Sequence, residues 1–357
     1  MAVAALSFAS CSGNVDPEGN GTDVPEGVLR IFADKTEIVA DGQDEVTFTV
    51  MFGSEDVSNA KTLQLTRSFE DGEPKYMAYG SNKFSTSTAG TYTFKAEYYY
   101  AGRQYSDNEI LVTATPFYTG DAEAYAQRVL AAYFTSTNCT SCPAASAGLK
   151  RLQGEHPGKI SVVSFHSDAL GYDPMAIPET ELFRSELGTN GFPNVFWNLR
   201  RGKYFVGPDF SESYQNECSI NQPTCGVAIN TNYDAATSKL DVELGIKSNL
   251  PAIHRYIVFI IEDGIQVPEQ NGKYSEYDNV VRKVIGAVNG NKINNDSPLT
   301  VGEEAKVTET ITFSSEWDAA SMRVVVAALL TDDGRTFIVN NVNECKVGES
   351  VGYLYNE

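Results

Sequence analysis

Positive charge is scarce in this chain. Its 357 residues include 27 Lys and Arg against 47 Asp and Glu, so the formal net charge is −20. Such a field repels a phosphate backbone, and nucleic-acid affinity depends on cationic contacts. The sequence also has no basic patch with interleaved aromatic residues. We therefore expect no nucleic-acid partner.

Long apolar runs and metal-ligand clusters are missing too. No stretch approaches the ~20 apolar residues that a membrane-spanning helix needs. The chain has three His and six Cys, with one closely spaced Cys pair, whereas a structural zinc site needs four ligands. Neither a Gly-x-Ser-x-Gly elbow nor a phosphate loop occurs. We expect no metal and no other cofactor.

Residues 1–27 contain a short apolar run, small residues and Cys11, followed by Gly, Asn, Asp and Pro without periodicity. The polar stretch after Cys11 is typical of a flexible tether. The stretch Phe8-Ala9-Ser10-Cys11 resembles the lipobox of bacterial lipoproteins, although no Lys or Arg precedes the apolar run as in a signal peptide. The resemblance implies a signal-peptide remnant and a lipid anchor at Cys11. The alternative is an ordinary N-terminal tail.

Residues 28–116 alternate apolar and polar side chains, with turn signals at Asp41-Gly42 and Ala101-Gly102. Short strands with such turns predict a β-sandwich. The segment "ADGQDEVTFTV" is similar to bacterial immunoglobulin-like (Ig-like) modules. Residues 225–357 show the same character and predict a second β-sandwich.

Residues 120–224 alternate strands with helices, which is an α/β pattern. The segment "RVLAAYFTS" predicts a strand, a helix follows Cys142, and "KISVVSFHS" predicts a second strand. A helix ending at Gly188, a hairpin around Arg200-Arg201-Gly202 and a closing helix complete the segment. Together the three segments predict a multidomain α+β chain.

Cys139 and Cys142 stand between a predicted strand and a predicted helix. The pair could be a working dithiol, a metal clamp or a structural staple. Unpaired N–H groups at a helix N-terminus favour a thiolate, the attacking species in exchange. One Cys pair is too few for zinc, but a permanent disulfide is a serious alternative outside the cytoplasm.

Gly191-Phe192-Pro193 precedes an apolar strand. Strand, Cys-x-x-Cys, helix, strand, helix, Gly-apolar-Pro and hairpin occur in the order of the thioredoxin superfamily, which this segment resembles. The resemblance implies a cis peptide at Pro193, facing the dithiol, beside which a substrate strand can pair. Asn138 replaces a frequent Trp, and Thr140-Ser141 brings no positive charge between the sulfurs. We therefore expect no strongly oxidising dithiol.

His166 ends the second predicted strand of this segment. Functional groups gather at the carboxyl edge of such sheets, so His166 should lie on the dithiol side. It could stabilise a thiolate or shuttle a proton, with Asp168 or Asp173 orienting it. The alternative is a loop His bonded to backbone.

The C-terminal third contains "FIIEDG" and "YSEYDNVVRKVIGAVNG". Here the chain resembles the Omp28-related outer-membrane lipoproteins of Bacteroidetes, in which a thioredoxin-like domain precedes a β-sandwich. The resemblance implies a location in the cell envelope. We interpret Asn279 and Arg282 within this segment as structural residues of a strand or loop with a salt bridge.

Three further cysteines leave pairing open. Cys218 could bond Cys225 across a short loop, or Cys225 could bond Cys345. An odd number leaves one of them free.

Two functions fit the sequence. The first is a tethered thiol–disulfide oxidoreductase of envelope proteins, in which Cys139 attacks, Cys142 resolves, Pro193 presents the substrate backbone and His166 assists. The second is a surface-exposed binding or adhesion lipoprotein whose disulfide is only structural. The intact Cys pair with Pro193 favours the first, and two flanking β-sandwiches favour the second.

Overall fold

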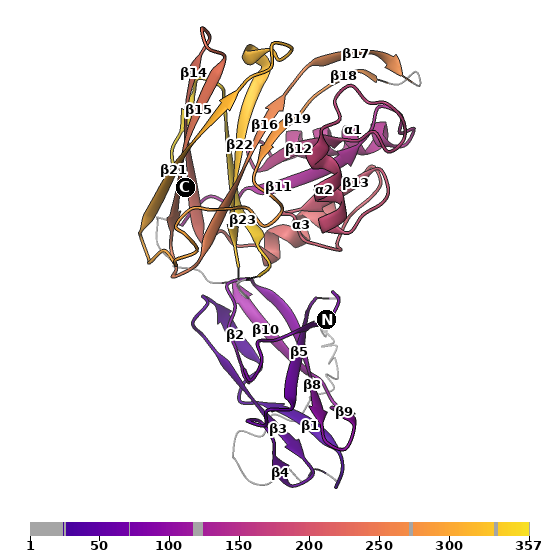
Figure 1. Cartoon of the computed structure of the whole chain (residues 1–357), viewed down its shortest axis with the longest axis vertical. Helices are drawn as coiled ribbons and strands as arrows, with labels where there is room; N and C mark the ends of the chain where they lie inside the picture. The colour runs from indigo at the N-terminus through magenta and orange to yellow at the C-terminus, as the bar shows by residue number, and fades with distance from the viewer. Residues whose placement is uncertain are drawn as a thin grey trace, which may run out of the picture. The chain divides into compact units, whose positions relative to one another are not determined.

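The computed structural model describes residues 24, 26–70, 72–116, 124–270, 274–331 and 335–356. The chain forms two compact units, Met1–Thr115 and Pro116–Glu357 (Figure 1). Cys11 and the expected lipobox lie outside the described residues. No helix in the described ranges has both the length and the apolar character needed to cross a membrane.

The N-terminal unit consists of two β-sheets around one core, as the alternating pattern predicts. Along β3, Val46, Phe48 and Val50 are buried while the residues between them are more exposed. Strands of both sheets contribute to this core. The Ig-like assignment stays a prediction. One sheet contains β1 (Leu29–Ala33), β3 (Val46–Phe52), β4 (Glu55–Asp56) and β7 (Lys83–Phe84); the other contains β2 (Glu37–Ala40), β5 (Leu63–Phe69), β6 (Lys75–Tyr76), β8 (Gly90–Tyr99), β9 (Arg103–Tyr105) and β10 (Ile110–Pro116).

The C-terminal unit is organised around one eight-stranded sheet. Its order is β13 (Asn194–Trp197), β11 (Val129–Thr135), β12 (Ile160–His166), β19 (Val280–Ile285), β16 (His254–Glu262), β22 (Met322–Leu330) and β23 (Ile338–Lys346), with β20 (Asn291–Lys292) beside β16. β12 pairs in parallel with β11 on one side and, at Ser164 and Val280, with β19 on the other. The segments 120–224 and 225–357 therefore share one sheet and one compact unit, and the expected boundary between them is not a boundary between compact units.

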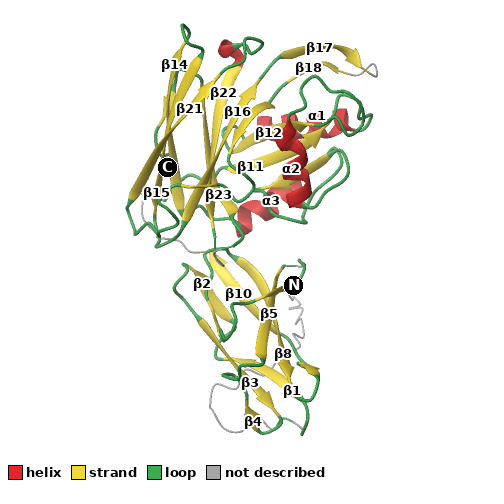
Figure 2. Ribbon diagram, viewed as in Figure 1, coloured by secondary structure: helices red, strands yellow, loops and turns green. Residues whose placement is uncertain are grey.

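Three helices flank the first part of this sheet (Figure 2). α1 (Cys142–Glu155) and α3 (Ser211–Ile220) pack on one face through residues such as Leu149 and Tyr214. α2 (Pro178–Leu187) covers the other face through Phe183 and Leu187. α2 ends at Gly188 in the left-handed conformation, φ 83°, as the sequence predicts. Of the expected hairpin, one strand forms, and only an isolated bridge joins Val195 to Phe205.

A four-stranded sheet packs on the far part of the eight-stranded one. It contains β21 (Glu304–Thr312), β15 (Lys239–Ser248), β14 (Cys225–Asp234) and β24 (Ser350–Val351). Their apolar residues meet Tyr256, Val258 and Ile260 of β16 in one core. The remaining elements are the hairpin of β17 (Ile265–Gln270) and β18 (Tyr274–Tyr277) and a short helix, η1 (Ala319–Ser321). One layer of the C-terminal sandwich is thus the sheet that also carries β11 and β12.

Candidate functional site

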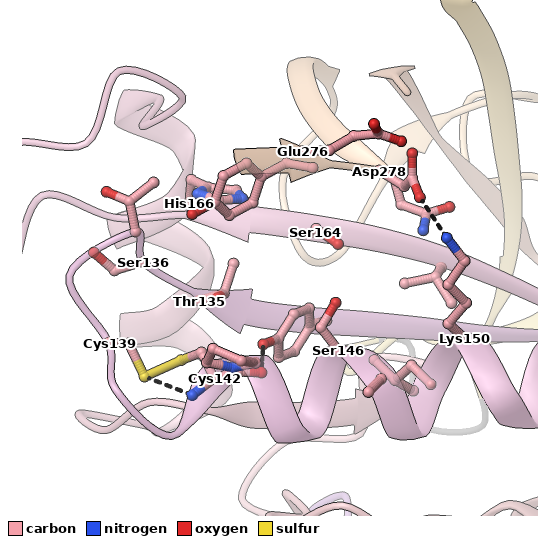
Figure 3. A pocket seen from close by; sticks show the side chains of 18 of the residues that line it. Thr135, Ser136, Cys139, Cys142, Ser146, Lys150, Ser164, His166, Glu276 and Asp278 are labelled. Atoms are coloured by element: carbon pink, nitrogen blue, oxygen red, sulfur yellow. Dashed lines mark hydrogen bonds and ion pairs between the residues drawn. A yellow bond between two sulfur atoms is a disulfide. The ribbon is translucent and has the colours of Figure 1, made fainter. Parts of the chain in front are cut away.

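Cys139 and Cys142 form a disulfide where the loop after β11 enters α1 (Figure 3). β11 is buried along its whole length, which fixes the start of this loop. Pro143 occupies the first turn of α1, where its missing N–H costs no helical hydrogen bond. The N-terminus of α1 thus lies at the disulfide, with the backbone N–H of Cys142 directed at Sγ of Cys139.

Hydrogen bonds hold the pair in place, among them one to a sulfur and one to the Cys142 carbonyl. The backbone N–H of Cys142 donates to Sγ of Cys139 over 3.1 Å. The hydroxyl of Tyr133 donates to the carbonyl of Cys142 over 2.8 Å. Cys139 is 7% exposed and Cys142 3%, so both residues are buried and the first is slightly more accessible; their roles as attacking and resolving thiols stay predictions. After reduction, the same N–H would stabilise a Cys139 thiolate.

His166 lies at the end of β12, on the side of the sheet where the disulfide lies, as the sequence predicts. Its Nδ1 is 2.9 Å from Oδ2 of Asp173, and both side chains are buried. Of the two expected orienting residues, Asp173 is the partner in the structure. Burial would raise the pKa of Asp173, but hydrogen bonds from His166 and from the backbone N–H groups of Thr137 and Met175 lower it overall. The proton-shuttle role of His166 stays a prediction.

A pocket of about 270 Å³ lies beside the disulfide. Its walls are α1, the ends of β11 and β12, and residues 276–279, which are the end of β18 and the two residues that lead into β19. Cys139, Cys142 and His166 all line it. Three of the four residues expected at the site therefore share one concave surface.

The wall formed by residues 276–279 was not expected from the sequence. The ring of Tyr277 meets the His166 ring edge to face, with 5.4 Å between centroids. Nζ of Lys150 on α1 lies 3.2 Å from Oδ2 of Asp278, which closes the pocket at its far end (Figure 3). The parallel pairing of β12 with β19 brings this segment to the disulfide. No local pattern in the sequence signals that pairing.

Pro193 lies in a neighbouring groove rather than in this pocket. The Phe192–Pro193 peptide bond is cis, so that prediction is confirmed. The groove contains Ser141 and Ala144 from the start of α1 together with residues 191–194 and 204–208. The dithiol loop thus lies between two concave surfaces, one on each side.

Asn279 and Arg282 have structural contacts, as interpreted. Nε of Arg282 lies 3.2 Å from Oε2 of Glu262. Asn279 has a positive φ of 60°, and its amide oxygen accepts a hydrogen bond from Nη2 of Arg323. These contacts shape the bend that leads from β18 into β19.

The remaining described cysteines are unpaired. Cys218 is half-buried, while Cys225 and Cys345 are buried in the C-terminal unit. Neither of the disulfides expected for Cys225 is present. Burial raises the pKa of the Cys345 thiol to about 11 and also raises the pKa of the Cys225 thiol, which disfavours their reactive thiolates. Within the described ranges, no group of three or more His, Cys, Asp or Glu could hold a metal ion.

Comparisons with known proteins agree with an envelope protein. Residues 181–351 match the family model described as outer membrane protein Omp28. This match supports an Omp28-related chain and a location in the cell envelope. It begins after the disulfide and His166, but it includes Pro193 and residues 276–279 of the pocket wall. No curated protein matches the chain by sequence.

Solved structures give a likeness in fold. HBP35 of Porphyromonas gingivalis aligns with a TM-score of 0.53 and 12% identity, over 63% of this chain and 76% of that one. A protein of Agrobacterium tumefaciens aligns with a TM-score of 0.42 and 17% identity, over 65% of this chain and 99% of that one. At these identities only the fold is compared.

Proposed function

We propose that this chain is a lipid-anchored envelope protein whose thioredoxin-like segment exchanges thiols and disulfides with other envelope proteins. The observation that carries the proposal is the disulfide at the N-terminus of α1, with the Cys142 N–H donating to Sγ of Cys139 over 3.1 Å. The order β11, α1, β12, α2, β13 supports the thioredoxin-like interpretation.

The exchange step follows from the sulfurs' positions. In the reduced protein, the Cys139 thiolate attacks one sulfur of a partner disulfide, whose bond breaks and releases a partner thiolate. Cys142, deprotonated in turn, attacks Sγ of Cys139. The mixed disulfide breaks, the partner leaves with both sulfurs reduced, and Cys139–Cys142 is the oxidised product. The reverse sequence oxidises a partner dithiol.

His166 and Pro193 have separate parts in this proposal. His166, oriented by Asp173, faces the pocket from which Cys142 can lose its proton. Pro193 lies in the groove next to Ser141, where a partner's backbone would lie. No positively charged residue stands between the two cysteines, which argues for a middling rather than a strongly oxidising potential.

One observation favours the second function, a surface-binding protein with a structural disulfide. Both cysteine residues are buried, and buried thiols exchange slowly. Under that alternative the β-sheets of the two units would bind the ligand or partner. The disulfide would only stabilise the start of α1.

One experiment distinguishes the exchange function from the structural disulfide. The full chain is equilibrated in glutathione and dithiothreitol buffers, and its redox state is read by alkylation and mass shift. We expect a potential between about −270 and −120 mV, the range of thioredoxin-like catalysts. Cys139→Ser should abolish reduction of a protein disulfide such as insulin, while Cys218→Ser should not. A pair that stays oxidised below about −300 mV and reduces no protein disulfide supports the structural staple.

A further inference from the structure

The pocket beside the disulfide has a charged rim, formed by residues 276–278 and by Lys150 of α1. Glu276 and Asp278 contribute two carboxylates, and Lys150 contributes one ammonium group (Figure 3). Lys150 and Asp278 neutralise each other at 3.2 Å. The carboxylate of Glu276 accepts a hydrogen bond from the amide of Gln266 over 2.9 Å, and no cation among the described residues pairs with it. The rim therefore has one excess negative charge.

The inner wall adds no net positive charge. His166 faces the pocket beside the carboxylate of Asp173, so a proton on the imidazole would be balanced within the pair. The other residues of the lining are neutral, among them Ser146, Gln153 and Ser164. With a chain charge of −20, the surroundings also favour a cation over an anion. The pocket is thus suited to a ligand with a positive group.

The size and the anchoring of the pocket favour a small ligand. A volume of about 270 Å³ lies near the lower end of small-molecule sites, which run from roughly 300 Å³ upward. The β17–β18 hairpin that carries the rim is fixed by Val267, which packs with Met175 and Val280. The Pro193 groove, which contains Ser141 and Ala144 from the start of α1, is where a folded protein would dock under the proposed exchange function. The two sides of the dithiol loop thus suit ligands of different size.

We propose that this pocket binds a small thiol carrying an ammonium group, which reduces the Cys139–Cys142 disulfide. The proposal rests on the proposed exchange function and names the second substrate of the same site. Glu276 binds the ammonium group, and the thiol end lies toward the sulfurs. The pocket gives the small thiol an approach to the disulfide that leaves the Pro193 groove to the protein partner.

The reaction balances with two molecules of the thiol. The first loses its proton to solvent and attacks Cys139, the Cys139–Cys142 bond breaks, and Cys142 leaves as a thiolate that takes up a proton. The second attacks the sulfur of the bound first molecule. A small disulfide departs, and Cys139 is left as a thiolate. Two thiols are oxidised to one disulfide, and the protein disulfide is reduced to a dithiol.

The test measures reduction of the oxidised full chain by cysteamine, 2-mercaptoethanol and 3-mercaptopropionate, which are cationic, neutral and anionic. Each rate is divided by the rate of the same thiol with 4,4′-dithiodipyridine, a neutral disulfide that none of the three thiols forms, which removes intrinsic reactivity. One favourable charge pair near a protein surface is worth about fivefold or more in rate. We expect cysteamine to exceed mercaptopropionate by at least about fivefold, and less in 1 M salt, where the screening length falls to about 3 Å.

Glu276→Gln should remove most of that preference. Glu212→Gln, which changes an exposed carboxylate on α3 that does not line the pocket, is the matched control and should keep it. Equal normalised rates for the three thiols, or the same result for both variants, would overturn the proposal. In parallel with these thiol rates, we measure the reduction of insulin by the full chain with dithiothreitol as the reductant. If it proceeds while the thiols show no preference, only the small-thiol proposal fails. If neither insulin nor any thiol exchanges with the pair, the exchange function fails with it.

Discussion

Ser164 on β12 pairs in parallel with Val280 on β19, although the two residues lie far apart in the sequence. This pairing joins the Cys-x-x-Cys segment to the C-terminal strands within one sheet. It also brings Tyr277 against His166 and Asp278 against Lys150. The pocket beside the disulfide is therefore lined by residues from both halves of the C-terminal unit.

A Cys142→Ser variant should trap partners. Cys139 can still attack a disulfide, but no second sulfur is present to resolve the mixed disulfide. We expect Cys139-linked complexes with envelope proteins on non-reducing gels of the native host, and their loss on reduction. Cys139→Ser and the double variant should give none. Complexes of equal intensity with Cys139→Ser would contradict the assignment of Cys139 as the attacking residue.

Asp173→Asn should change the stability of the fold in a pH-dependent way. The pKa of Asp173 is lowered in the folded state, because its hydrogen bonds outweigh the effect of burial. Its ionised form therefore stabilises the fold above the unfolded pKa of about 3.9, and this contribution disappears as the pH falls through the folded pKa.

At pH 7 we expect Asp173→Asn to lower the free energy of unfolding by about 1–3 kcal/mol, measured with urea. Below about pH 5 the wild type should lose stability faster than the variant, so that the difference shrinks. Glu212→Gln, which changes an exposed carboxylate on α3, is the control. Parallel curves for wild type and Asp173→Asn from pH 7 to pH 3 would show that the carboxylate contributes no pH-dependent stability.

Phe259→Ala should destabilise the whole C-terminal unit in one transition. Phe259 on β16 is fully buried and meets Phe165 on β12 edge to face, with 6.0 Å between centroids. Truncating such a residue typically costs about 3–5 kcal/mol. Because both strands belong to one core, we expect residues 120–224 and residues 225–357 to lose the same amount of stability.

The fluorescence of the two tryptophans can show whether the C-terminal unit unfolds in one transition. Trp197 lies on β13 and Trp317 lies just before η1, packed against the core shared by β14, β15, β16 and β22, while the N-terminal unit contains no Trp. In variants that keep one Trp each, the urea midpoints reported by Trp197 and Trp317 should shift together. Phe94→Ala, in the core of the N-terminal unit, should leave both unchanged. A shift in Trp317 alone would mean that residues 120–224 unfold separately.

Cys11→Ala should release the protein from membranes in the native host. The motivation is the apolar run, the small residues before Cys11 and the tether after it. Fractionation and mass spectrometry of the N-terminus give the readout, with Cys218→Ser as the control. A variant that stays in the membrane fraction with unchanged processing would rule out the lipid anchor at Cys11.

Local patterns predicted the local features well. The position of the disulfide before a helix, the end of α2 at Gly188 and the placement of His166 at a strand end all depend on neighbouring residues. The cis bond before Pro193 followed from a resemblance. The rim of Glu276, Tyr277 and Asp278 depends on the pairing of β12 with β19. The sequence of neither strand indicates which strand it will pair with. For the same reason the sequence suggested two segments where the structure has one compact unit.

The eight-stranded sheet also has a consequence for folding during synthesis of the chain. β12 ends at His166, but the strand that covers its second edge begins at Val280. Synthesis proceeds at about 5–20 residues per second, so for several seconds the emerging chain has an apolar strand with an open edge. Open edges attract other strands. During export this chain should therefore depend on a holding chaperone until the C-terminal strands have crossed the membrane.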